Sequence, residues 1–144
     1  MAYEDIVERY IEIIEYATRN SDCFGFLINP NRLNEKQLKT INSLKPYLIR
    51  QVNGISEWPR YPHIYHHVEM NAYRCCPEAR KALLELPNIF SPYENNLPED
   101  ICFFRGDAPW LITVYHEEMA FLNNATEEDI DFLIFYYIRF WRSW

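Results

Sequence analysis

Apolar residues recur every three or four positions in three stretches of the chain, which is the spacing that places them on one face of a helix. The first stretch covers residues 3–19, the second follows the capping residue Asn34 to Leu44, and the third runs from Pro77 to about residue 86. Proline is favoured in the first turn of a helix, because its missing N–H would have no partner there. We therefore expect three helices before residue 87.

Other apolar runs are short or alternate with polar residues, which is typical of β-strands. The strands predicted from these patterns cover about residues 23–28, 47–52, 63–73, 101–105 and 110–116. Strands and helices in this mixture favour the α+β class. We predict a single domain over residues 1–144, with a mainly antiparallel sheet, a central hairpin near residues 101–116 and three to four helices packed on the sheet.

The last two predicted strands are joined by Gly106-Asp107-Ala108-Pro109, whose residues are typical of turns. A loop of these four residues would place Arg105 opposite Trp110 and Phe103 opposite Ile112 on one face. The other face would carry Cys102, Phe104, Leu111 and Thr113. Arg105 is then either a cation–π partner of Trp110 or a residue that binds anions.

Thr126 precedes three carboxylates, a pattern that indicates the first turn of a C-terminal helix. The predicted helix continues to about Trp141 and is apolar almost all round. A surface helix needs only one apolar stripe, so the remaining apolar side chains must be buried by the core or by a second chain. The candidates for contact in a homodimer or with another partner are Phe135, Tyr136 and Phe140.

Charge is distributed unevenly along the chain, whose formal net charge is −7. Residues 85–144 carry three basic and eleven acidic side chains. An acidic surface repels phosphate, so we expect no binding to nucleic acid, whereas the same surface suits a basic protein partner. Aromatic residues, which are enriched at contact surfaces, make up 17% of the chain. The candidate binding residues are Arg105, Trp110, Trp58, Tyr61 and Glu118.

The N-terminus is acidic and interrupted, unlike a signal peptide, and the longest apolar run, residues 132–138, is too short to span a bilayer. The four cysteines include the adjacent pair Cys75 and Cys76, which does not suit the disulfide framework of a small secreted protein. These features predict a cytoplasmic protein with reduced thiols and no membrane association.

Histidines and carboxylates supply the candidate chemistry. In a zinc protease helix, the motif that begins at His116-Glu117 would need a second histidine at position 120, where this chain has Ala120. His116 could still form an acid–base pair with Glu99 or Glu117, or a structural hydrogen bond in the same place. The weak catalytic candidates are His116, Glu117, Glu99 and Arg105, and the weak metal-binding candidates are His67, Glu69 and His116. No phosphate-binding loop is possible with three glycines, so we expect no cofactor.

Seven short motifs together resemble a loosely defined group of small uncharacterised bacterial proteins. They are Phe24-Gly25-Phe26, Trp58-Pro59, Leu97–Asp100, Cys102–Arg105, Trp110-Leu111, His116-Glu117 and Thr126–Glu128. The chain departs from the pattern at Arg60, where a glycine is expected after the Trp-Pro step. The resemblance supports the hairpin and implies no catalytic residues, because the group has no established activity.

Size, acidity and aromatic content favour a non-enzymatic cytoplasmic binding protein. Its acidic C-terminal portion would engage a basic protein partner, as an immunity or antitoxin-like protein does when it blocks a toxin. The alternative is a small metal-dependent or acid–base hydrolase that uses the His/Glu cluster. A tightly bound metal would favour the hydrolase.

Overall fold

The computed structural model of the chain describes residues 3–29, 31, 33, 35–55, 57–59, 68–85, 99–114, 119–135 and 140–143. The elements in chain order are α1 (Tyr3–Arg19), β1 (Cys23–Ile28), α2 (Glu35–Leu44), the short 3₁₀ helix η1 (Lys45–Tyr47), β2 (Leu48–Asn53), β3 (Glu69–Arg74), α3 (Pro77–Leu84), β4 (Glu99–Arg105), β5 (Ala108–Val114), β6 (Met119–Asn123), α4 (Glu127–Phe135) and β7 (Phe140–Ser143). The α+β class is confirmed, with a mainly antiparallel sheet on which helices pack.

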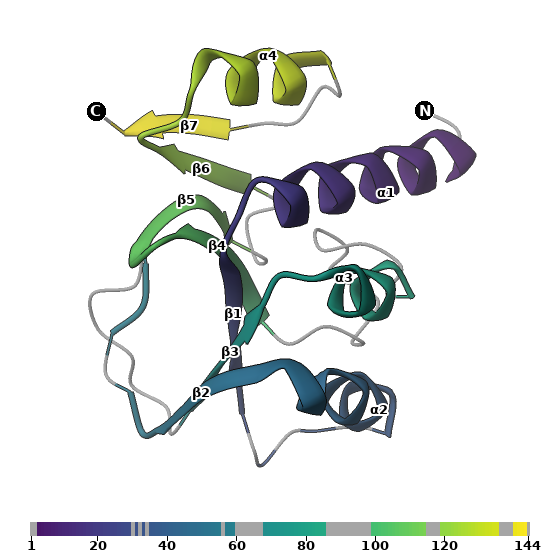
Figure 1. The fold of residues 1–144 in the computed structure, drawn as a ribbon, viewed down its shortest axis with the longest axis vertical. Coiled ribbons are helices and arrows are strands. Elements are labelled where there is room, and N and C mark those ends of the chain that lie inside the picture. Colours follow the sequence, from purple (N-terminus) through teal and green to yellow (C-terminus); the bar gives the residue numbers. More distant parts are fainter. Residues whose placement is uncertain are drawn as a thin grey trace.

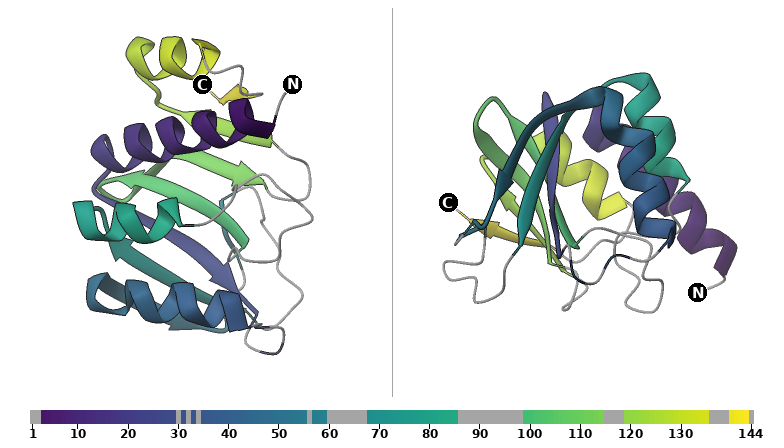
Figure 2. Two further views of the ribbon diagram at one scale, coloured as in Figure 1. Left: turned by 90° about the vertical axis from the view of Figure 1, so that its right-hand side faces the viewer. Right: turned by 90° about the horizontal axis from the view of Figure 1, so that it is seen from below.

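The sheet has seven strands in the order β2-β3-β1-β4-β5-β6-β7. Each neighbouring pair is antiparallel except β6 and β7, which are parallel. The predicted hairpin is β4–β5, and it lies at the centre of this order. Helices α1, α3 and α2 lie side by side across one face of the sheet (Figures 1 and 2), and α3 contacts both of its neighbours.

One cross-strand row of large side chains forms the centre of the core between the sheet and the helices. The strand registers place these residues side by side from β3 to β6: Tyr73, Phe24, Phe103, Leu111 and Leu122. All are buried, and they pack with Ile14 and Ala17 of α1 and Leu133 of α4. Helix α4 therefore buries its apolar side against the same core as α1–α3.

The hairpin register differs from the prediction. Arg105 pairs with Ala108, so the turn consists of Gly106 and Asp107 alone, and the register shifts between Phe103 and Phe104. Gly106 has a φ of 61°, which glycine adopts without strain at the first central position of a two-residue hairpin turn. As a result Ile112 lies opposite Cys102 instead of Phe103.

The C-terminal helix is shorter than predicted. It ends at Phe135, and Phe140–Ser143 form strand β7 beside β6. Phe140, predicted as a contact residue on this helix, is therefore a strand residue whose Cα partner is Ala120. Aromatic residues are favoured in strands, and pairing with β6 supplies backbone hydrogen bonds that the apolar periodicity does not encode.

Helix α2 buries Leu44, whereas the side chain of Leu38 is 43% exposed. The strand predicted over residues 63–73 begins at Glu69 in the structure, and residues 63–67 lie outside the described residues.

Candidate functional site

Arg105 is held by partners from three directions, so we do not place the binding site there. Its guanidinium carbon lies 4.0 Å from the centre of the Trp110 ring, which confirms the predicted cation–π pair. Its two terminal nitrogens donate to the carboxylate of Asp129 at 2.7 and 2.8 Å, and its Nε donates to the carbonyl of Asn20 at 2.8 Å. Trp110 is itself buried, and its Nε1 donates to the Ser21 hydroxyl at 2.7 Å.

Asp129 is the acceptor at the centre of this cluster, and its side chain is 1% exposed. It also accepts hydrogen bonds from the Tyr16 hydroxyl at 2.7 Å and from the Thr126 amide at 2.8 Å. Burial alone would raise the pKa of Asp129, but the hydrogen bonds from Arg105, Tyr16 and Thr126 outweigh it and hold the pKa below its usual value. Burial and the neighbouring carboxylate raise the pKa of Tyr16. The cluster ties α1, the hairpin and α4 together.

The predicted His/Glu cluster falls largely outside the described residues. His67, His116, Glu117, Glu118, Tyr61 and Tyr136 lie there, as do the side chains of Glu99, Phe135 and Phe140. Glu69 is described and opens β3, where it pairs with Asn53 and Ile28. No group of three potential metal ligands occurs among the described residues. The acid–base pair, the metal site and the homodimer therefore stay predictions.

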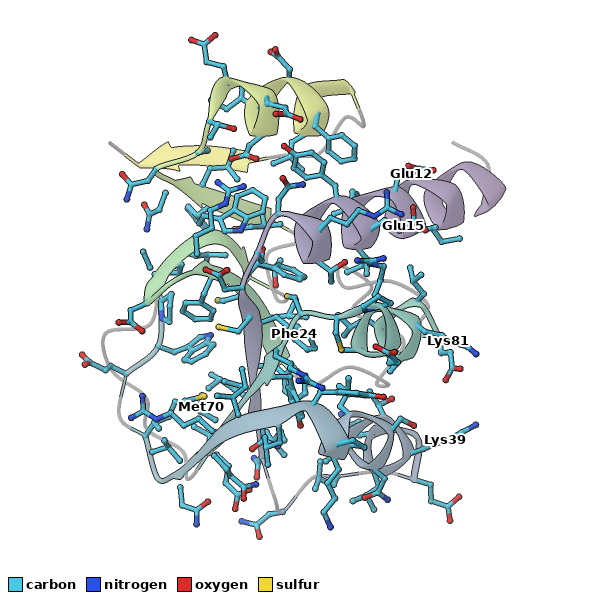
Figure 3. The ribbon with its side chains drawn as sticks, in the orientation of Figure 1. Glu12, Glu15, Phe24, Lys39, Met70 and Lys81 are labelled. Carbon is cyan, nitrogen blue, oxygen red and sulfur yellow. The ribbon has the colours of Figure 1, made fainter. Side chains whose placement is uncertain are left out.

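The face of the sheet opposite the helices carries a cavity of about 840 Å³. The cavity lies along a second cross-strand row, in which Arg50, Ala72, Gly25 and Cys102 lie side by side from β2 to β4. Arg50 and Ala72 of this row line the hollow, whereas the space above Gly25 is occupied by the ring of Trp58. Met70 borders the hollow from β3, and Figure 3 shows it on the opposite side of the sheet from the core residue Phe24.

Trp58 covers part of this hollow. Its ring packs edge-to-face on Phe104, with 6.0 Å between the ring centres, and both rings line the cavity. A Cβ atom added to Gly25 would lie 3.1 Å from Cη2 of Trp58 and 3.2 Å from the carbonyl oxygen of Asn71. Glycine at position 25 is therefore what allows the indole to lie so close to the sheet.

Three charged residues line the same cavity as the two aromatic rings. Arg50, Glu57 and Asp107 line the cavity and are exposed, and none of them forms an ion pair with another described residue. Cys23 also lines the cavity, and burial, followed by the charges of Asp22 and Asp107, raises the pKa of its thiol. A thiol that stays protonated is a poor nucleophile, which disfavours Cys23 as a nucleophile.

Sequence reasoning selected Trp58, which lines the cavity, as a candidate binding residue but did not find the cavity. The available signal was Gly25 inside an otherwise large apolar run, since a glycine in a strand often marks the close approach of another group. Arg50, Glu57 and Asp107 carried no signal, because three isolated charged residues far apart in the sequence do not indicate a shared site.

Comparisons with protein-family models, with curated proteins and with solved structures give no match. The resemblance to small bacterial proteins therefore stays a prediction. Among the described residues, no helix combines the length and the apolar character needed to cross a membrane.

Proposed function

We propose that this chain is a non-enzymatic binding protein for a basic protein partner, and that the cavity on the face of the sheet opposite the helices receives a lysine or arginine side chain of that partner. The observation that carries the proposal is the combination of two aromatic residues, Trp58 and Phe104, with Glu57 and Asp107 around one cavity, where neither carboxylate forms an ion pair with another described residue. Aromatic faces attract cations, and a carboxylate adds a charge-assisted hydrogen bond.

The size and lining of the cavity support the same function. Ligand-binding cavities typically enclose roughly 300–1,000 Å³ and combine apolar walls with a few polar groups. This cavity of about 840 Å³ has Met70, Ala72 and Phe104 in its walls. A long basic side chain could bury its methylene groups against these walls while its charged end reaches the rim.

The acidic C-terminal portion would assist the encounter with a basic partner. Glu127, Glu128 and Asp131 of α4 are exposed, whereas Arg105 is neutralised by Asp129. The negative potential that remains would increase the association rate of a basic protein. High salt would screen this potential and remove the increase. An immunity or antitoxin-like role in the cytoplasm is the biological setting we propose.

Titration of the ¹⁵N-labelled protein with a capped peptide that contains a single arginine tests this proposal. We expect shifts of the Trp58 indole N–H signal and of the Phe104 amide signal, and weaker binding in the variants Glu57→Gln and Asp107→Asn. Glu12→Gln is the control, because Glu12 is exposed on α1, on the helix-covered side of the sheet (Figure 3). No shift at Trp58 or Phe104 would contradict the proposed site.

A further inference from the structure

Arg50 lies on the edge strand β2, at one end of the cross-strand row that runs along the cavity. Its Cα partner is Ala72 of β3, whose own partner on β1 is Gly25. No large side chain therefore lies in this row between Arg50 and the place where Trp58 covers Gly25. Arg50 and Trp58 thus both line the cavity.

Arg50 and Asp107 lie on different sides of the cavity. Strands β3 and β1 lie between β2, which carries Arg50, and β4, which leads into the turn with Asp107. Three strand spacings of about 4.8 Å give roughly 14 Å across the sheet. Arg50 and Asp107 are therefore far enough apart to engage different groups of a bound segment.

We propose that Arg50 is a specificity-determining residue that binds a carboxylate group of the partner. The cavity then selects a dipolar segment, with a basic side chain near Trp58, Glu57 and Asp107 and an acidic side chain near Arg50. This inference rests on the proposed function, because it assumes that the cavity receives the basic side chain.

The chemistry of the guanidinium group supports this role. Its planar fork of N–H donors matches a carboxylate, and it forms stronger pairs with carboxylates than with neutral groups. A segment that carries only positive charge would instead be repelled by Arg50. In an extended peptide, a span of roughly 14 Å corresponds to about four residues. The partner segment is therefore expected to carry its acidic residue about four positions from its basic residue.

Arg50 could also have a purely structural role, since charged residues on an edge strand discourage pairing with other chains. The two roles differ in their effect on ligand preference. Two capped peptides test this difference: each contains one arginine, and about four residues along the chain one contains glutamate and the other glutamine. Dissociation constants are measured by NMR titration for the wild type and for Arg50→Gln, Arg50→Glu and Arg19→Gln.

We expect the wild type to bind the glutamate peptide roughly fivefold more tightly than the glutamine peptide, as for one partly exposed ion pair. Arg50→Gln should abolish this preference, Arg50→Glu should reverse it, and Arg19→Gln should retain it, because Arg19 is exposed on α1 away from the cavity. Equal binding of both peptides by the wild type, or a preference that persists in Arg50→Gln, would overturn the role of Arg50 alone. Binding of neither peptide would overturn the proposed function as well.

Discussion

Arg105 forms a bidentate ion pair with Asp129, which joins the end of strand β4 to the first turn of helix α4. The same guanidinium group lies over the ring of Trp110. The backbone amide of Asp129 donates in turn to the Thr126 hydroxyl at 3.1 Å, which caps the helix. A residue that the sequence suggested for anion binding is thus engaged by a carboxylate of its own chain.

Replacing Arg105 by Met should lower the free energy of unfolding by about 2–3 kcal/mol. Loss of one partner from a buried ion pair typically costs about 3–5 kcal/mol, and the value is smaller here because the Arg105 side chain is 31% exposed. Urea denaturation measures the change. The matched control Arg19→Met removes an exposed arginine of α1 and should change the free energy by less than about 0.5 kcal/mol. Equal effects of the two substitutions would contradict a stabilising role for the Arg105 cluster.

Asp129 should make the stability depend on pH in the acid range. Because its pKa is lower in the folded state than the value of about 3.9 expected in the unfolded chain, ionised Asp129 stabilises the fold above that value. This contribution is lost as the pH falls through the folded-state pKa.

The difference in unfolding free energy between the wild type and Asp129→Asn should therefore be constant above about pH 5 and shrink below about pH 4. Urea denaturation at a series of pH values measures it. Asp131→Asn, at an exposed position of the same helix, is the control and should show no comparable trend. A difference that grows on acidification would contradict the assignment.

Local sequence patterns predicted most of the elements because helical periodicity and apolar alternation are local properties. Residues 3–19 were predicted as a helix and form α1, and residues 23–28 form β1. The register of the hairpin could not be obtained in the same way. It depends on the choice between a four-residue loop and the Gly106-Asp107 turn, and on an irregularity beside Phe104 that the pattern does not encode.

The candidate site was harder to predict than the fold because its parts come from separate strands. Ala72, which lines the cavity, lies beside Gly25, over which Trp58 packs, only when β3 and β1 pair in the observed register. Arg50 and Asp107 come close to the same cavity only through the order of the strands. Trp58 could be selected from its turn-rich segment, but what it covers is a property of the folded sheet.

Cys75 should react slowly with thiol reagents at neutral pH. Burial, assisted by the neighbouring thiols of Cys23 and Cys76, raises its pKa to about 12. Its thiolate fraction is then roughly a thousandfold lower than that of an ordinary cysteine, and the thiolate is the reactive form. Iodoacetamide labelling followed by mass spectrometry of the peptides measures the rate, with glutathione as the reference thiol. Denaturation in urea should restore a normal rate, and fast labelling of the native protein would contradict the raised pKa of Cys75.

Replacing Gly25 by Ala should push the Trp58 indole away from the sheet by a few tenths of an ångström. The added methyl group would lie 3.1 Å from the indole and 3.2 Å from the Asn71 carbonyl, so the indole must move. We expect a loss of about 1–3 kcal/mol in unfolding free energy, as for other overpacked sites. The indole is one of the two groups that the added methyl group would contact. Gly25→Ala combined with Trp58→Leu should therefore destabilise the protein by less than the sum of the two single changes.

The control for this double-mutant cycle is Gly106→Ala, measured by urea denaturation in the same two backgrounds. A Cβ atom at Gly106 meets no atom within 4 Å, but the φ of 61° disfavours alanine, so a loss of about 1 kcal/mol is expected from backbone strain alone. That loss should be the same with Trp58 or Leu at position 58. If the loss caused by Gly25→Ala were also the same with Trp58 or Leu at position 58, the position of the indole would not depend on the absence of a side chain at Gly25. Glycine at position 25 would then have another cause.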